Sequence, residues 1–201
     1  EERARLDALR YQINPHFLFN ALNSLRATFP LAAEASREMV TDLAEYFRST
    51  LARPEADLAE VRDEIESVKH YLAIEQKRFG EELIVEIAVA PETEKLRVPV
   101  FLFQPLVENA FRHGFTRSKG LLRLRISARL EGEQLVLEVA NTGQWSEPEQ
   151  RERPGLGLEN IRSRLRLLYD GKAALALSVE GGWVRGRIVL PRETNPPSSI
   201  S

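Results

Sequence analysis

The sequence contains no cysteine and only one methionine among its 201 residues. Without cysteine, the protein has no disulfide bonds, no cysteine-ligated metal and no cysteine nucleophile. The formal net charge of −2 does not indicate a strongly basic surface, so we expect no nucleic-acid partner, although the clustered arginines leave room for a local basic patch. No apolar run is long enough to span a bilayer, and no signal peptide is visible. The first ten residues already have a helical pattern and lack an initiating methionine, which predicts a fragment of a longer protein.

Residues 1–80 have the pattern of helices, because apolar residues recur at steps of three and four. The clearest stripe lies in a predicted helix at about 58–79 and consists of Leu58, Val61, Ile65, Val68 and Leu72. Such a stripe must be buried against other helices, and a second copy of the chain is one source of them. The sequence therefore predicts a helical, dimeric first domain over residues 1–80.

The pattern changes near Gly80, where segments of alternating polarity begin. Strands are predicted at 83–89, 121–130, 134–140, 174–179 and 183–190, and helices at about 100–113 and 157–169. Gly132 and the pair Gly181–Gly182 mark hairpin turns. We expect an α+β chain: a helical bundle, then an α/β domain over 81–192 with helices on one face of its sheet. The Pro/Ser-rich residues 193–201 are predicted to be a disordered tail.

The first block that suggests chemistry is INPHFLFNALNSL at 13–25. Pro15 predicts a distortion of the helix beside His16, and Asn20 follows four residues later on the same helical face. A neutral imidazole is a good nucleophile near neutral pH. Taken alone, His16 is better explained as an ordinary core or surface histidine.

The second block is FLFQPLVENAFRHGF at 101–115. Apolar residues of this predicted helix can face a core, while its polar side chains gather on the other side: Glu108, Asn109, Arg112 and His113. An asparagine oxygen is a hard ligand, and nucleotide-bound Mg²⁺ takes only one or two protein oxygens. Gly114 fits a helix C-cap. The alternative is the polar face of an ordinary amphipathic helix.

Two shorter blocks follow. Asn141 and Gly143 belong to NTG, directly after a predicted strand, and an asparagine side chain can pair with an adenine edge. In RPGLGLENIRSRL at 153–165, Gly155 and Gly157 precede a predicted helix, where backbone amides can approach phosphate. Each block fits an ordinary turn as well.

Together and in this order, the four blocks resemble the LytS/YehU-type sensor histidine kinases of bacterial two-component systems, from about residue 6 to residue 191. INPHFLFNALNSL and QPLVENAFRHG are the specific parts. The resemblance implies a dimeric phosphoacceptor bundle followed by an ATP-binding sandwich of the gyrase/Hsp90/histidine-kinase type. It also implies autophosphorylation by ATP, transfer to a response-regulator aspartate, and a parent protein anchored in the inner membrane with this part in the cytoplasm.

The resemblance also implies residue roles. His16 is the expected phosphoacceptor, and Asn20 occupies the position that assists dephosphorylation of the partner in many histidine kinases. Asn109 is the expected Mg²⁺ ligand, with Glu108, Arg112 and His113 beside it. The remaining cofactor-binding residues are expected to be Asn141, Gly143, Gly155, Leu156, Gly157 and Leu158.

Asn141 departs from the pattern, because the family usually has an aspartate there. An amide lacks the charge that strengthens a hydrogen bond to adenine, so we expect weaker or less selective ATP binding. The second glycine that usually follows NTG is missing, because Gln144 and Trp145 come directly after it, and the late glycine motif, GGWVRG at 181–186, lacks its usual threonine. The competing hypotheses are a dimeric scaffold or regulator phosphatase with a degenerate ATP site, and an ATPase that makes no phosphohistidine.

Overall fold

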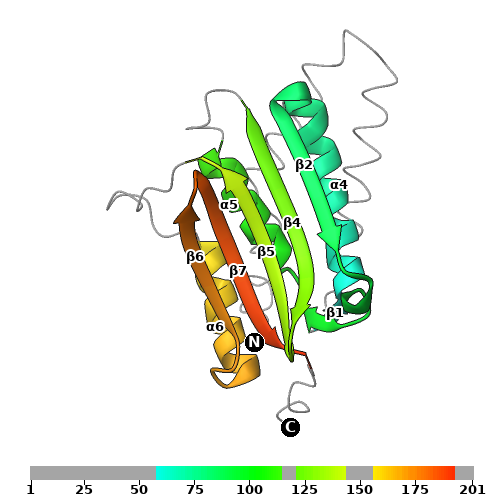
Figure 1. Cartoon of the computed structure of the whole chain (residues 1–201), viewed down its shortest axis with the longest axis vertical. Coiled ribbons are helices and arrows are strands. Elements are labelled where there is room, and N and C mark those ends of the chain that lie inside the picture. Colours follow the sequence, from blue (N-terminus) through cyan, green and yellow to red (C-terminus); the bar gives the residue numbers. More distant parts are fainter. Residues whose placement is uncertain (1–57, 115–120, 144–155, 193–201) are drawn as a thin grey trace, which may run out of the picture. The chain divides into compact units, whose positions relative to one another are not determined.

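The computed structural model describes residues 58–114, 121–143 and 156–192 (Figure 1). The chain divides into two compact units, of which the second contains Asp57–Ile65 and Glu81–Ser201. The first turn of helix α4 (Val61–Phe79) therefore belongs to the unit that contains the sheet. The sequence predicted that this unit begins only after residue 80. Most of the helical domain predicted over residues 1–80 falls on residues 1–57, outside the described residues, and remains a prediction.

The sheet of the second unit has five strands in the order β2-β4-β5-β7-β6. Its strands are β2 (Leu83–Val89), β4 (Leu122–Glu131), β5 (Gln134–Thr142), β6 (Ala174–Glu180) and β7 (Trp183–Pro191). β2 pairs with β4 in parallel, whereas the other three pairings are antiparallel. The short elements are η1 (Gly80–Glu82), η2 (Pro91–Thr93), β1 (Leu58–Glu60) and β3 (Arg97–Pro99).

Two helices of this unit, α5 (Phe103–Gly114) and α6 (Leu156–Tyr169), lie on one face of the sheet (Figure 1). The predicted alternation in β4 is confirmed. Leu122, Leu124 and Ile126 are buried, whereas Arg123 and Arg125 are exposed on the other face. The hairpin glycines are confirmed too, since Gly132, Gly181 and Gly182 have φ of +60°, +57° and +78°. The predicted α+β fold is therefore confirmed, and its core lies between the sheet and the helices.

The predicted start of the helix at residue 58 is wrong. Leu58, Ala59 and Glu60 form β1, which pairs with β3 in antiparallel register. The helix begins at Val61, whose amide donates to the carbonyl of Leu96 at 2.9 Å, and Arg62 donates to Glu94 at 3.0 Å. Carbonyl groups more than 30 residues away in the sequence thus satisfy the free amides at the start of the helix. A local periodicity does not contain that pairing.

Two glycines allow α5 to approach its neighbours closely. A Cβ atom at Gly186 of β7 would lie 2.8 Å from a methyl group of Leu106, so only glycine permits α5 to pack here as it does. A Cβ atom at Gly157, in the first turn of α6, would lie 3.0 Å from the Cβ atom of Pro105. Glycine at these two positions therefore brings α5 against both the sheet and α6.

No helix among the described residues is long and apolar enough to cross a membrane.

Candidate functional site

Helix α5 carries the second sequence block on its two faces. Phe103, Leu106, Val107, Ala110 and Phe111 are buried, whereas Glu108 and Asn109 are partly exposed. The side-chain amide of Gln104 donates to Glu108 Oε1 at 3.0 Å. The two residues are four positions apart and therefore lie on the same side of the helix. The polar face predicted from the sequence is present at Glu108 and Asn109.

The end of α5 meets the end of β5. A Cβ atom at Gly114 would lie 2.4 Å from a methyl carbon of Leu122 and 3.2 Å from Asn141 Nδ2. A Cβ atom at Gly143 would lie 3.7 Å from the Cα atom of Gly114. Gly114 does not have the left-handed φ of many C-cap glycines. Glycine is required here because a Cβ atom would collide with Leu122. The structure thus joins two sequence blocks that lie 27 positions apart (114 to 141).

Asn141 is nearly buried at this junction, with 4% of its surface exposed. Its side-chain amide donates to the carbonyl of Thr142 at 3.0 Å, which directs the side-chain oxygen away from that carbonyl as a hydrogen-bond acceptor. Thr142 accepts from the amide of Arg123 at 3.0 Å, and Gly143 donates to the carbonyl of Gly182 at 3.2 Å. The NTG turn is therefore held by β4 and by the β6–β7 hairpin.

The glycine block lies partly inside a helix. α6 begins at Leu156, one residue before the start predicted at about 157, so Gly157 and Leu158 are in its first turn. Leu158 is buried, and Gly157 is packed on Pro105 of α5. The backbone amides of a first helical turn are a favourable place for an anion.

Several predicted site residues fall outside what the structure describes. They are His16, Asn20 and Gly155, together with the side chains of Arg112, His113 and Leu156. The predicted site residues whose side chains or backbone the structure describes are Glu108, Asn109, Asn141, Gly143, Gly157 and Leu158. Contacts join Gly114 to Asn141 and Gly143, whereas Gly157 contacts Pro105 at the other end of α5.

Three residues that shape this site were not predicted from the sequence. Gln104 is four positions before Glu108, and that spacing was a usable signal. Thr142 and Pro105 gave no comparable signal, because their partners Arg123 and Gly157 are distant in the sequence.

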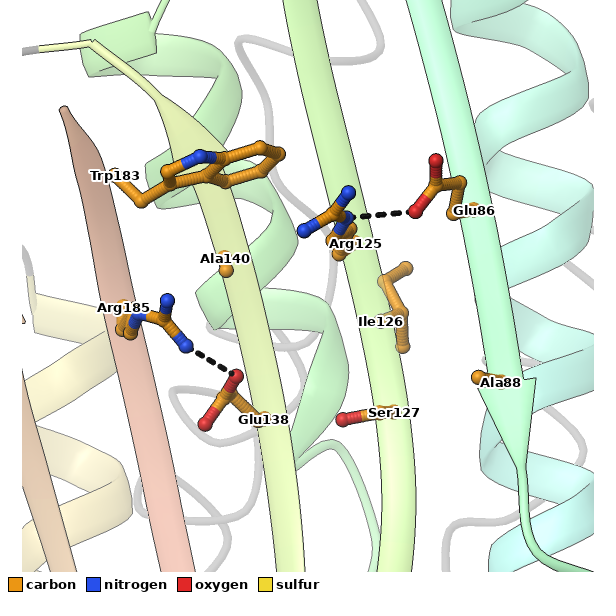
Figure 2. A pocket seen from close by; sticks show the side chains of 9 residues that line it. All are labelled: Glu86, Ala88, Arg125, Ile126, Ser127, Glu138, Ala140, Trp183 and Arg185. Carbon is orange, nitrogen blue, oxygen red and sulfur yellow. Dashed lines mark hydrogen bonds and ion pairs between the residues drawn. The ribbon is translucent and has the colours of Figure 1, made fainter. Parts of the chain in front are cut away.

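A separate shallow hollow lies on the opposite face of the sheet. Figure 2 shows Glu86 paired with Arg125 at 2.6 Å and Arg185 paired with Glu138 at 3.4 Å, on the side of the sheet away from α5 and α6. The guanidinium of Arg125 stands 4.6 Å from the ring centre of Trp183. The hollow measures about 160 Å³, below the roughly 300 Å³ at which ligand pockets usually begin. Residues alternate between the faces of a strand, so Glu138 and Asn141 are on opposite faces and the hollow is no part of the site.

Tyr169, the last residue of α6, has a buried hydroxyl group with no hydrogen-bond partner among the described residues. Burial raises the pKa of Tyr169 to about 12, although the positive charge of Arg164 lowers it in part.

The raised pKa predicts a loss of stability at high pH. Below pH 10 the phenol is protonated in both the folded and the unfolded states, and stability is unaffected. Between pH 10 and 12 the unfolded state ionises first, so the free energy of unfolding should fall by at most about 2 kcal/mol. Urea denaturation at pH 8 and pH 11.5 should show this additional loss in the wild type and not in Tyr169→Phe. An equal loss in both proteins would contradict the prediction.

Comparison with known proteins places these features in a class. Residues 4–83 match the family model described as histidine kinase. The fold is similar to that of the Acinetobacter baumannii histidine kinase AdeS, with a TM-score of 0.53 and 14% identity over 89% of this chain and 96% of that one. The fold and the sequence together define this chain as a relative of the histidine kinases.

The more specific resemblance is also confirmed. The chain is 36% identical to the sensor histidine kinase BtsS of Escherichia coli over 178 residues, which are 89% of this chain and 31% of BtsS. It is 31% identical to the sensor protein LytS of Bacillus subtilis over 188 residues, 88% of this chain and 32% of LytS. The chain therefore spans about a third of the length of each of these two relatives.

Proposed function

We propose that this chain is the catalytic core of a sensor histidine kinase, which uses ATP to phosphorylate His16 and passes the phosphoryl group to an aspartate of a response regulator. The observation that carries the proposal is the contact of Gly114, at the end of α5, with Asn141 and Gly143, at the end of β5. Two blocks of the family thereby form one polar corner, at the C-terminal end of α5, while the first turn of α6 packs on Pro105 near the start of the same helix. The longer parent protein, anchored in the inner membrane with this part in the cytoplasm, belongs to the same proposal.

Asn141 is proposed to bind the adenine base. The hydrogen bond from its amide to Thr142 leaves the side-chain oxygen to accept from the exocyclic amine of adenine. A Cβ atom at Gly143 would lie 3.7 Å from Asn141 Nδ2, so glycine keeps the space next to the amide free of a side chain. The amides around Gly157 and Leu158 are proposed to face the phosphates, together with Gly155 and Leu156.

Asn109 is proposed to hold Mg²⁺. Its partly exposed amide on α5 supplies one oxygen, which fits a metal that takes most of its ligands from phosphate and water. The bound Mg²⁺ would neutralise charge on the transferring phosphoryl group. Glu108, oriented by Gln104, is proposed to position groups beside Asn109, with Arg112 and His113 adding positive charge and hydrogen bonds.

Homodimerisation through residues 1–80 is part of the proposal, because residues 1–57 carry further apolar residues at helical spacing that need a surface to pack against. A nucleic-acid partner is not proposed, given the net charge of −2.

The test is phosphorylation by γ-labelled ATP with Mg²⁺. The purified chain should acquire label that is acid-labile and alkali-stable, the signature of phosphohistidine. Transfer to an added receiver domain should then remove the label from the chain. A folded chain that binds millimolar ATP and acquires no label would contradict the kinase proposal. A folded chain that binds no ATP would favour the scaffold or phosphatase function instead.

Asn141→Asp should tighten ATP binding while weakening the fold. A charged acceptor makes a hydrogen bond roughly twice as strong as a neutral one, so the Kd for ATP should fall about fivefold. The nearly buried carboxylate also loses the bond to Thr142, so the free energy of unfolding without nucleotide should fall by about 1–3 kcal/mol. Titration calorimetry and urea denaturation measure the two effects.

GTP provides the control for that variant, because guanine has a carbonyl group where adenine has the amine. The Kd for GTP should not improve in Asn141→Asp. An equal gain for both nucleotides would indicate that the residue acts on net charge and does not bind the base.

A further inference from the structure

The segment Val100–Leu102 immediately precedes α5, and side chains from two other helices hold it. The carboxylate of Glu64, in the first turn of α4, accepts hydrogen bonds from the amides of Phe101 and Leu102, both at 3.0 Å. Each oxygen takes one amide, so the interaction is bidentate. Arg164 of α6 donates to the carbonyl of Val100. Three consecutive residues are thus fixed before the helix begins at Phe103.

Phe101 adopts a backbone conformation that requires such support. Its φ is +59°, a region that bulky residues other than glycine rarely occupy because the Cβ atom approaches the backbone. The two amides that Glu64 binds are those of Phe101 itself and of the next residue. Glu64 is 3% exposed, and a buried carboxylate must be paired or hydrogen-bonded. The carboxylate and the left-handed turn therefore stabilise each other.

We propose that Glu64 is a positioning residue for the nucleotide site: its carboxylate holds Phe101 and Leu102 in the turn that sets the direction of α5, and thereby places Asn109. This inference rests on the proposed function. Asn109 lies six positions after Phe103, on a helix whose opposite face is buried, so a change at the first turn displaces the whole helix. Arg164 supports the same segment from α6, the helix that begins with Leu156 and Gly157.

The test compares two substitutions on the same helix. Glu64→Gln preserves size but turns an NH₂ group toward a backbone N–H, so one of the two hydrogen bonds is lost. The Kd for Mg·ATP should rise about tenfold, the effect of losing one bond to a charged group. Glu66→Gln is the matched control, because Glu66 is exposed and its carboxylate pairs with Lys69 of the same helix at 2.6 Å. Its Kd should stay within twofold of the wild type.

A second background separates positioning from general stability. Phe101→Gly accepts the positive φ without support. In that background Glu64→Gln should raise the Kd by less than threefold. Two results would overturn the proposal. One is a full tenfold rise of the Kd on Glu64→Gln in the Phe101→Gly background. The other is a Glu64→Gln protein that binds Mg·ATP within twofold of the wild type while its urea midpoint falls. The double variant also remains informative should Glu64→Gln alone fail to fold.

Hydrogen exchange in the nucleotide-free protein distinguishes this inference from the proposed function. If the wild type binds no ATP, the proposed function fails, and the exchange decides the role of Glu64. Glu64→Gln should then speed exchange selectively at the amides of residues 101–109, and Glu66→Gln should not. Unchanged exchange there, or a uniform increase across the sheet, would refute positioning.

Discussion

Replacing His16 with glutamine should abolish the phosphorylation of this chain by ATP. A glutamine amide is not a nucleophile at neutral pH, whereas an imidazole nitrogen is, so no covalent phosphoryl group can form at this position. Label from γ-labelled ATP should fall to background, a loss of more than about a hundredfold, as expected when the group that forms the covalent bond is removed. The Kd for ATP should remain unchanged, because the proposed nucleotide residues lie elsewhere in the sequence.

The chain offers its own control for that experiment. His70, in α4, is the only histidine of the sequence besides His16 and His113, and it is partly exposed. His70→Gln should retain labelling close to that of the wild type. Label that persists in His16→Gln and disappears in His70→Gln would move the phosphoacceptor to α4 and contradict the assignment of INPHFLFN. Label that persists in both would indicate another acceptor.

Replacing Gly186 with valine should remove a large part of the stability of the sheet unit. A Cβ atom at this position would lie 2.8 Å from one methyl group of Leu106 and 3.5 Å from a methyl group of Leu177. Leu106 is 3% exposed, so a shift of its methyl group disturbs the packed core around it. Overpacking of this kind costs about 1–3 kcal/mol, so alanine should lie in that range and valine at or above its upper end. That is a large fraction of the roughly 5–15 kcal/mol that stabilises a domain.

Urea denaturation should show a lower midpoint for Gly186→Val with an unchanged slope. Ala176→Val is the matched control, because Ala176 lies on the neighbouring strand β6, is exposed, and pairs with Arg187 of β7. The added methyl groups there meet solvent, and a β-branched residue is favourable in a strand. Since α5 also carries Asn109, Gly186→Val should weaken ATP binding as well. A variant as stable as the wild type would show that α5 does not depend on this glycine.

The buried residues of the strands and of α5 were predictable because burial on one face gives apolar residues a regular spacing in the sequence. Leu122, Leu124 and Ile126 alternate with arginines, and the period of two identifies the strand without its neighbours. Hairpin glycines such as Gly132 were predictable for a similar local reason, since a positive φ favours glycine. The start of α4 at Val61 was not predictable, because β1 exists only through its pairing with β3.

The sequence by itself determined the strand and helix pattern, the polar face of Glu108 and Asn109, and the resemblance to sensor histidine kinases, since each depends on residue types at short spacing. Only the tertiary structure decided that Gly114 meets Asn141, that Gly186 lies against Leu106, and that Glu64 holds the turn at Phe101. These contacts join residues that are 27 to 80 positions apart (114 to 141 and 106 to 186). Their geometry depends on how the elements pack together, which no local pattern of residues contains.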